Sequence, residues 1–186
     1  FKQNRKLRLL SIASAIKFGL GESGYFLRSA FIASLWPLWA IGIASSLANI
    51  GAAVSFYFGG KVIDRFKSLR VLNFEVISTR IVNLIALLFP SIVSPALMGA
   101  SSLTFGVGWV ALGSLLQKEF TQAQRATMGS INTLAGNLAF GVFSVILGVL
   151  ADWYGARTAL IITNVVLFAP LFFYRKIFLH EQEGIG

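Results

Sequence analysis

The chain has 186 residues, of which 56% are hydrophobic and only 12% are charged. Soluble globular domains usually carry about 25% charged residues, so this composition excludes an ordinary soluble domain and indicates lipid as the solvent. The net charge of +9 does not indicate a nucleic-acid partner, because the Lys and Arg residues occur in short clusters and form no continuous basic face. The sequence has no cysteine, which excludes disulfides and thiolate metal sites.

Apolar segments of about 20 residues, the length at which a helix crosses a bilayer, recur along the whole chain. Proline, glycine and charged residues separate them into six predicted transmembrane helices, namely Leu9–Leu35, Leu38–Gly60, Val71–Phe89, Ala96–Leu116, Ala126–Leu150 and Thr158–Tyr174. We therefore predict an all-α membrane protein with one six-helix domain over residues 9–178. Basic residues 1–8 precede this domain, and the polar tail 179–186 follows it.

Lysine and arginine in the connecting segments predict the orientation, because basic loops stay on the cytoplasmic side. Six spans place twelve of these residues on the side of both termini: Lys2, Arg5, Lys6, Arg8, Lys61, Arg65, Lys67, Arg70, Lys118, Arg125, Arg175 and Lys176. The opposite side has only Arg157, with Arg28 near the end of the first span. We predict a multi-pass protein of a plasma membrane or bacterial inner membrane, with both termini in the cytoplasm.

The sequence also aligns sparsely with itself at an offset of 88 residues. The aligned pairs are Asn49 with Asn137, Gly60 with Gly148, Asp64 with Asp152, Phe66 with Tyr154, and Leu72 with Leu160. Because three predicted spans separate the members of each pair, two three-helix units of opposite orientation are expected. Many transporters have this plan and bind their solute between the repeats. Chance agreement between helices rich in Gly and Leu is the alternative.

A Gly-x-x-x-Asp-Arg pattern follows the second predicted span, formed by Gly60, Asp64 and Arg65 and followed by the basic Arg70. It resembles the signature loop of the major facilitator superfamily, with Lys67 where that family usually has glycine. Residues 124–130 and 148–155 resemble the fifth helix of the family's C-terminal half. The resemblance implies helices seven to twelve of a twelve-helix transporter, with residues 1–8 as the end of its central cytoplasmic loop. A second six-helix half would then come from the same polypeptide or from another chain.

The resemblance implies that this loop is a latch that favours the outward-facing state. Asp64 can accept hydrogen bonds from the N-terminus of a neighbouring helix, while Arg65 and Arg70 can pair with carboxylates or anionic headgroups. A plain cytoplasmic anchor is the alternative for Lys61, Lys67 and Arg70.

Two charged residues lie well inside the first predicted span. A charge in the hydrocarbon costs about 2.5–3.5 kcal/mol or more, so it usually faces protein or a water-filled cavity. Lys17 and Glu22 are five residues apart and point to different sides of a helix, so they need partners elsewhere. The resemblance implies that this helix lines the central cavity. We predict Lys17 and Glu22 as a solute or proton site, with a structural ion pair as the alternative.

Further polar residues occur in the later spans. Asn132 and Asn137 are candidates for contacts with the same cavity, with interhelical hydrogen bonds as the alternative. Glu75 and Arg80 lie on the third span, which in this family packs on the outside of the half. For them we predict a structural intramembrane pair.

The function expected from these features is secondary active transport of a small solute by alternating access, with Glu22 as a candidate for proton coupling. No catalytic residue, metal or cofactor is expected. A membrane scaffold or assembly subunit that transports nothing is the alternative. A distant alternative is an intramembrane serine protease, because residues 21–24 resemble the Gly-x-Ser-Gly motif of rhomboid proteases. Ser23 lacks a nearby base, however, since the only histidine, His180, lies in the polar tail.

Overall fold

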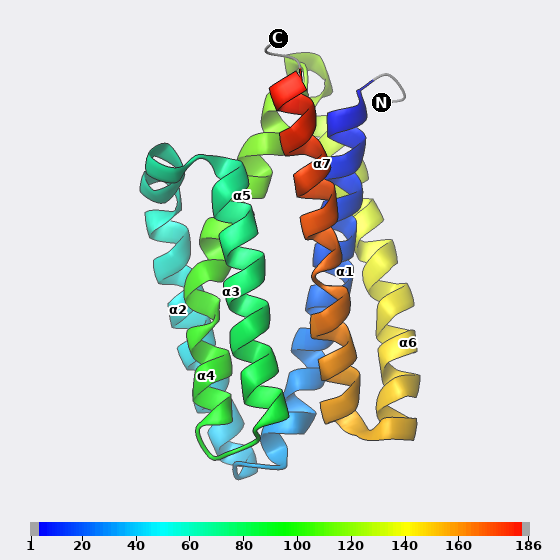
Figure 1. The fold of residues 1–186 in the computed structure, drawn as a ribbon. Helices are drawn as coiled ribbons and strands as arrows, with labels where there is room; N and C mark the ends of the chain where they lie inside the picture. The colour runs from blue at the N-terminus through cyan, green and yellow to red at the C-terminus, as the bar shows by residue number, and fades with distance from the viewer. Residues whose placement is uncertain (1–3, 184–186) are drawn as a thin grey trace.

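The computed structural model describes residues 4–183, and in this part of the chain every regular element is a helix. The long helices lie side by side along one axis (Figure 1). In chain order the elements are α1 (Arg5–Ala33), α2 (Leu38–Phe66), α3 (Ser68–Leu88), α4 (Ser94–Ala100), α5 (Ser102–Glu119), a short 3-10 helix (Gln122–Gln124), α6 (Arg125–Val166) and α7 (Ala169–Glu183). The predicted all-helical fold is confirmed.

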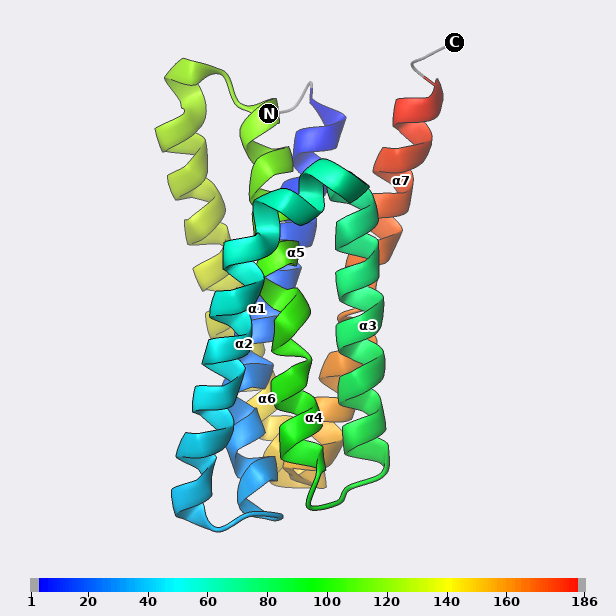
Figure 2. The same cartoon turned by 90° about the vertical axis from the view of Figure 1, so that its left-hand side faces the viewer.

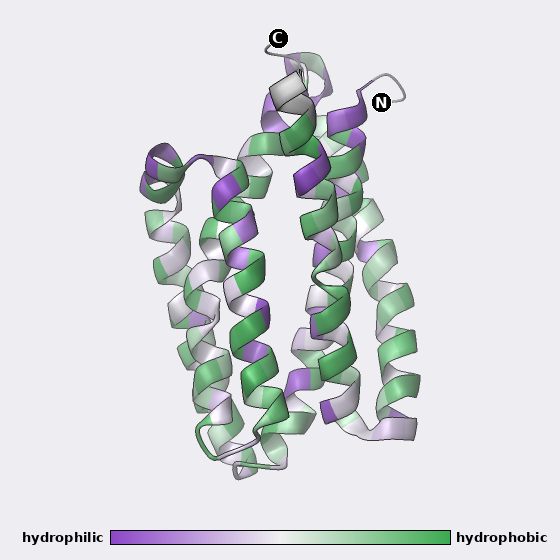
Figure 3. Cartoon of the chain, viewed as in Figure 1, coloured by the Kyte–Doolittle hydropathy of each residue, from purple (hydrophilic) through white to green (hydrophobic). Residues whose placement is uncertain are grey.

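Four helical stretches are long and apolar enough to cross a membrane: Leu38–Phe66, Ser68–Leu88, Ser94–Glu119 and Gln122–Leu179. The third combines α4 and α5, because Ser101 between them keeps a helical backbone (φ −60°, ψ −22°). α1 has the length of α2 but is more polar, since it carries Lys17, Glu22 and Arg28. Many large apolar side chains are exposed on the bundle, as expected of helices in lipid. Most of the length of the helices is coloured as hydrophobic in Figure 3.

Two residues adopt a backbone conformation that favours glycine. Lys67, between α2 and α3, has φ 64° and ψ 141°, and Gly155 has φ 81° and ψ 153°. They are the only residues with positive φ in the described part of the chain. Gly155 divides α6 into two helical segments, residues 125–154 and 156–166. The α2–α3 connection lies at the end of the bundle where α1 begins and α7 ends, whereas the bend in α6 lies at the other end (Figure 1).

The segment predicted as a loop after the second span is helical instead. α2 continues to Phe66 and α3 begins at Ser68, so Lys67 alone makes the connection. Gly60, Asp64 and Arg65 therefore lie on the last turns of α2. The turn is this short because the positive φ of Lys67 reverses the chain within one residue.

Packing between the helices follows a reciprocal pattern. α1 packs most extensively against α6, and α2 packs most extensively against α5. At each contact a glycine lets the backbones approach closely. A Cβ atom on Gly19 would lie 2.7 Å from the backbone of Ala139, and one on Gly106 would lie 2.5 Å from the backbone nitrogen of Phe56 and 2.9 Å from the carbonyl oxygen of Ala52. Small residues commonly bring helices together in membranes, where no hydrophobic effect drives their association.

Two apolar clusters fill the ends of the bundle. The larger is at the end where the chain begins and includes Leu10, Leu72, Leu112 and Tyr174. The smaller is near the opposite end and includes Phe31, Leu87, Met98 and Leu160. A cavity with polar walls lies in the middle part of the bundle. The first segment of α6 stands at the edge of the bundle (Figure 2), and only Gly136 and Leu147 of this segment are buried.

Candidate functional site

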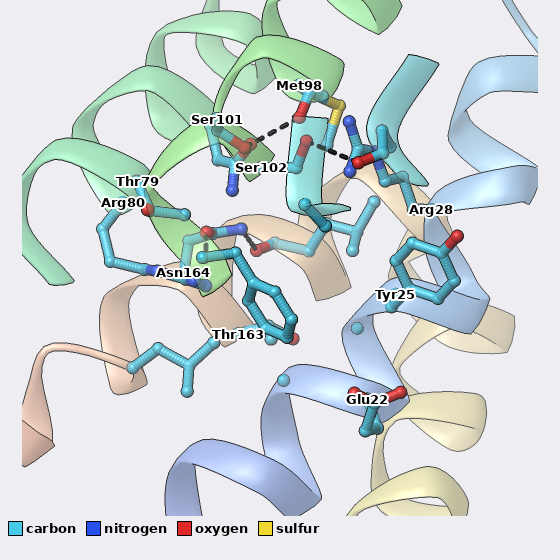
Figure 4. Close-up of a pocket in the computed structure, with 18 of the residues that line it drawn as sticks. Glu22, Tyr25, Arg28, Thr79, Arg80, Met98, Ser101, Ser102, Thr163 and Asn164 are labelled. Atoms are coloured by element: carbon cyan, nitrogen blue, oxygen red, sulfur yellow. Dashed lines mark hydrogen bonds between the residues drawn. The ribbon is translucent and has the colours of Figure 1, made fainter. Parts of the chain in front are cut away.

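The cavity has a volume of about 280 Å³ and is bounded by α1, α2, α3, α5 and the second segment of α6. Charged residues on α1 and α3 line it, together with hydroxyl and amide side chains from α2, α3, α5 and α6 (Figure 4). The charged residues are Lys17, Glu22, Arg28 and Arg80, and the neutral polar ones include Asn49, Thr79, Asn83, Ser101, Ser102, Thr163 and Asn164. This concentration of polar groups inside an apolar bundle makes the cavity the candidate site.

Lys17 forms a buried salt bridge at the side of the cavity. Its Nζ lies 2.6 Å from Oε2 of Glu75 on α3, and the two side chains are 6% and 1% exposed. The ring of Trp109 on α5 lies 5.8 Å from the same Nζ. Glycine is needed at position 108, because a Cβ atom there would lie 2.7 Å from Cγ of Glu75. Helices α1, α3 and α5 thus enclose the ion pair.

The predicted pairing of Glu75 with Arg80 is therefore corrected. The two residues lie five positions apart on α3, so their side chains leave the helix on different sides. Glu75 takes Lys17 as its salt-bridge partner and attracts Arg80 only electrostatically. Arg80 instead donates a hydrogen bond of 3.2 Å from its guanidinium group to Oδ1 of Asn164. The amide of Asn164 donates in turn to the carbonyl oxygen of Leu160, which fixes its orientation.

Arg28 also reaches the cavity, from α1 (Figure 4). Its Nε is buried, and its guanidinium group has neither a hydrogen bond nor a salt bridge to any residue that the structure describes. Arg28 and Arg80 repel each other electrostatically. In the sequence, Arg28 lies near the end of the first predicted span. Its position inside the segment predicted to cross the membrane was the signal that could have marked it.

Glu22 lies on the cavity wall formed by α1, away from Asn164 and Arg80 (Figure 4). It is partly buried, and its carboxylate makes no salt bridge within the described part of the chain. Of the four residues predicted for a solute or proton site, the structure thus brings Lys17 and Glu22 to one cavity.

The two predicted asparagine residues lie elsewhere. Asn132 donates a hydrogen bond of 3.2 Å to Oγ of Ser14, which links α6 to α1, and its own Oδ1 is buried without a partner among the described residues. Asn137 is exposed on the first segment of α6. Asn164, which does line the cavity, was not singled out, although it is an amide within the sixth predicted span.

Asp64, Arg65 and Arg70 are exposed at the end of the bundle where the chain begins. Arg65 lies over the ring of Phe66, 5.5 Å from its centre. None of the three forms a salt bridge with the part of the chain described here. The predicted latch contacts are thus not formed among the described residues.

Ser23 is buried between α1 and α6. Its hydroxyl donates to the carbonyl oxygen of Gly19 at 2.7 Å and lies 2.9 Å from Oγ of Ser144. This arrangement is typical of a serine that packs between helices. The side chain of His180 lies outside the part of the chain whose side chains are described.

No protein-family model matches this chain, and no solved structure matches it significantly. The major facilitator resemblance therefore stays a prediction.

Proposed function

We propose that this chain forms one half of a secondary transporter that moves a small solute by alternating access. The observation that carries the proposal is the polar cavity, which has charged walls and lies in the middle of an otherwise apolar bundle. Lys17 is 12 residues after the start of α1, which places it about 18 Å along a helix of about 43 Å. Secondary transporters bind their solutes near the bilayer midplane, between repeated helical units.

The proposal includes six membrane crossings in two inverted three-helix units. The first unit would be α1, α2 and α3. The second would be α4 with α5, then residues 125–154, then residues 156–166 with α7. The two turns with positive φ support this division, because Lys67 and Gly155 are 88 residues apart and lie at opposite ends of the bundle. This offset is the one at which the sequence aligns with itself.

The reciprocal packing of the helices supports the same division. α1 of the first unit packs on the middle helix of the second, while α5 of the second packs on the middle helix of the first. Gly106 follows Gly19 by 87 residues, and Ala139 follows Ala52 by the same number. The close contacts of Gly19 with Ala139 and of Gly106 with Ala52 are thus related by exchange of the two units. Such exchange is what a two-fold axis in the membrane plane would produce.

A second six-helix half is the proposed partner. Five glycines on α2 and the first segment of α6 have open space where a Cβ atom would be: Gly42, Gly60, Gly129, Gly141 and Gly148. Lipid contact gives no reason for glycine on these helices, whereas close packing of another helix does. Asn137 is exposed, and Asp64 and Arg65 form no salt bridge with the described residues; all three would gain partners from the same second half.

The proposed orientation has both termini in the cytoplasm. α1 begins, α2 ends, α5 ends and α7 ends at one end of the bundle (Figure 1), and most basic residues outside the cavity are near that end. Basic segments stay on the cytoplasmic side during insertion.

A membrane scaffold is the second candidate, and labelling of single cysteines distinguishes the two. The chain has no native cysteine, so each substitution introduces a unique thiol. Gly21 lines the cavity and has open space around its Cα, which makes Gly21→Cys a mild probe. In vesicles of both orientations, alternating access predicts that an impermeant maleimide labels this cysteine from either side.

Two controls calibrate the labelling. Lys67→Cys should react only from the cytoplasmic side, and Ile92→Cys, exposed at the opposite end, only from the outside. Reaction of Gly21→Cys from one side alone would contradict alternating access and favour the scaffold. Reaction of Lys67→Cys from outside intact cells would contradict the proposed orientation.

A further inference from the structure

The charges around the cavity do not balance. Lys17, Arg28 and Arg80 are positive, whereas the two acidic residues near them are Glu22 and Glu75. The salt bridge with Lys17 uses the Glu75 oxygen Oε2 at 2.6 Å, so that pair is close to neutral as a unit. Two arginines then remain against the single carboxylate of Glu22. The wall of the cavity carries a net positive charge.

Glu22 does not neutralise either arginine. It precedes Arg28 by six residues on α1, and side chains at this spacing are not neighbours on a helix. It forms no salt bridge with Arg80 or Arg28 among the described residues, and Figure 4 shows it apart from both. Among the residues that the structure describes, no carboxylate therefore forms a salt bridge with Arg28 or Arg80.

Most of the hydrogen-bonding capacity of the two arginines is also unused among the described residues. An arginine side chain has five N–H donors in a planar fork and stays protonated at neutral pH. Arg80 uses one contact, to Asn164, and Arg28 donates to none of the described residues. Unpaired cationic groups in a bilayer are costly, and two that repel each other are more so. An oxyanion between them would accept paired hydrogen bonds, and its negative charge would offset both the cost of the unpaired cations and their mutual repulsion.

We propose that the solute of this cavity is a small oxyanion, with a carboxylate, phosphate or sulfate group that Arg28 and Arg80 bind. Hydroxyl and amide groups of Thr79, Asn83, Ser101 and Asn164 lie on the same walls and can bind neutral parts of the solute. The volume of about 280 Å³ is near the lower limit for ligand pockets, which restricts the solute to a small molecule. Lys17 is a positioning residue, because its charge is paired with Glu75 in the salt bridge. This inference rests on the proposed transport function.

Direct binding tests the inference without requiring transport. The full chain is purified in detergent, and its thermal unfolding is followed by tryptophan fluorescence while phosphate, sulfate, acetate or succinate is added. Sodium salts of equal ionic strength are compared with choline chloride and with glycerol as cationic and neutral probes. We expect saturable stabilisation by at least one oxyanion and none by choline or glycerol.

Charge-neutral variants assign the site. Arg28→Gln and Arg80→Gln should each weaken oxyanion binding about tenfold or more, since each removes a charge-assisted contact. Arg80→Lys keeps the charge but loses the fork, and should weaken binding less than Arg80→Gln. Arg8→Gln, an exposed change at the start of α1, should leave binding unchanged. Equal binding by the wild type and both Gln variants would overturn the inference.

A second measurement remains if the arginine variants do not fold. Gly21→Cys is treated with methanethiosulfonate reagents of opposite charge, and the rates are normalised to those of free cysteine in buffer. A cationic cavity should favour the anionic sulfonatoethyl reagent over the cationic trimethylammonium reagent by about tenfold or more, and phosphate or succinate should slow that reaction. A preference for the cationic reagent would overturn the inference.

The remaining outcomes separate this inference from the proposed function. If short-chain phosphatidic acid alone stabilised the protein and soluble oxyanions did not, the ligand of the cavity would be a lipid headgroup. That result would overturn the inference. Stabilisation by choline or glycerol alone would also overturn it and leave the transport proposal intact. Saturable oxyanion binding together with one-sided labelling of Gly21→Cys would support it and contradict alternating access.

Discussion

Breaking the buried salt bridge between Lys17 and Glu75 should destabilise the fold far more than removing both of its charges. The two charges lie 2.6 Å apart, which corresponds to an attraction of about 6 kcal/mol at an effective dielectric constant of about 20. Desolvation of two buried ions takes several kcal/mol each, so the net contribution of the pair is small. A single partner left alone in this environment keeps its desolvation penalty without the attraction.

The substitutions Lys17→Met and Glu75→Gln preserve shape while removing one charge each. We expect each single variant to lose about 3–5 kcal/mol of unfolding free energy. The double variant should lie within about 2 kcal/mol of the wild type, because no unpaired charge remains. The coupling energy of the double-mutant cycle should then be about 4 kcal/mol or more.

Reversible unfolding in mixed micelles, followed by tryptophan fluorescence and by circular dichroism, measures these free energies. Exposed Lys61→Met is the matched control and should change the unfolding free energy by less than about 0.5 kcal/mol. If the single variants lost no more than the double variant did, the pair would be hydrated and the burial argument would be refuted.

Three further predictions concern the backbone and the helix contacts. Lys67→Gly should raise the unfolding free energy by about 1 kcal/mol, because φ 64° strains a residue that has a Cβ atom. The control Lys61→Gly, within α2, should lower the unfolding free energy by about 1 kcal/mol. Chemical unfolding measures both changes, and a loss of stability in Lys67→Gly would contradict the strain. Gly19→Ala should lower the thermal midpoint, because overpacking against α6 costs about 1–3 kcal/mol. Gly21→Ala is the control and should leave the midpoint unchanged, because a Cβ atom there meets open space. An equally lower midpoint for both variants would contradict the close contact at Gly19. Arg157→Gln removes hydrogen bonds of 2.7 and 3.0 Å to carbonyl groups at the end of α3. We expect faster hydrogen exchange confined to that end of α3, because Arg157 caps these carbonyl groups. Unchanged exchange would contradict this capping role.

The prediction for Lys67 also bears on the proposed inverted arrangement. In each proposed unit a sharp turn follows the middle helix, and the residues there have the same backbone conformation although one is Lys67 and the other Gly155. The family pattern has glycine at the position of Lys67, and the positive φ explains why glycine suits it. Lys67 therefore adopts a strained backbone conformation at this turn.

The sequence by itself determined the solvent and the elements. Apolar segments of bilayer length predicted long helices, and the helices of the structure begin and end within several residues of most predicted limits. Hydropathy and helix-breaking residues act locally along the chain, so a single sequence is enough to predict the helices. The segment after Gly60 was the exception, because a single residue with positive φ replaced the expected loop.

The partners of the buried charges were decided only by the tertiary structure. Lys17 and Glu75 are 58 residues apart, and Arg80 and Asn164 are 84 apart, so no local pattern links them. The packing of α1, α3 and α6 brings these side chains together, and it leaves Arg28 on the cavity wall without an acidic partner in the described chain. Charges in a low-dielectric interior pair with whatever the packing places within reach, and sequence distance does not enter that choice.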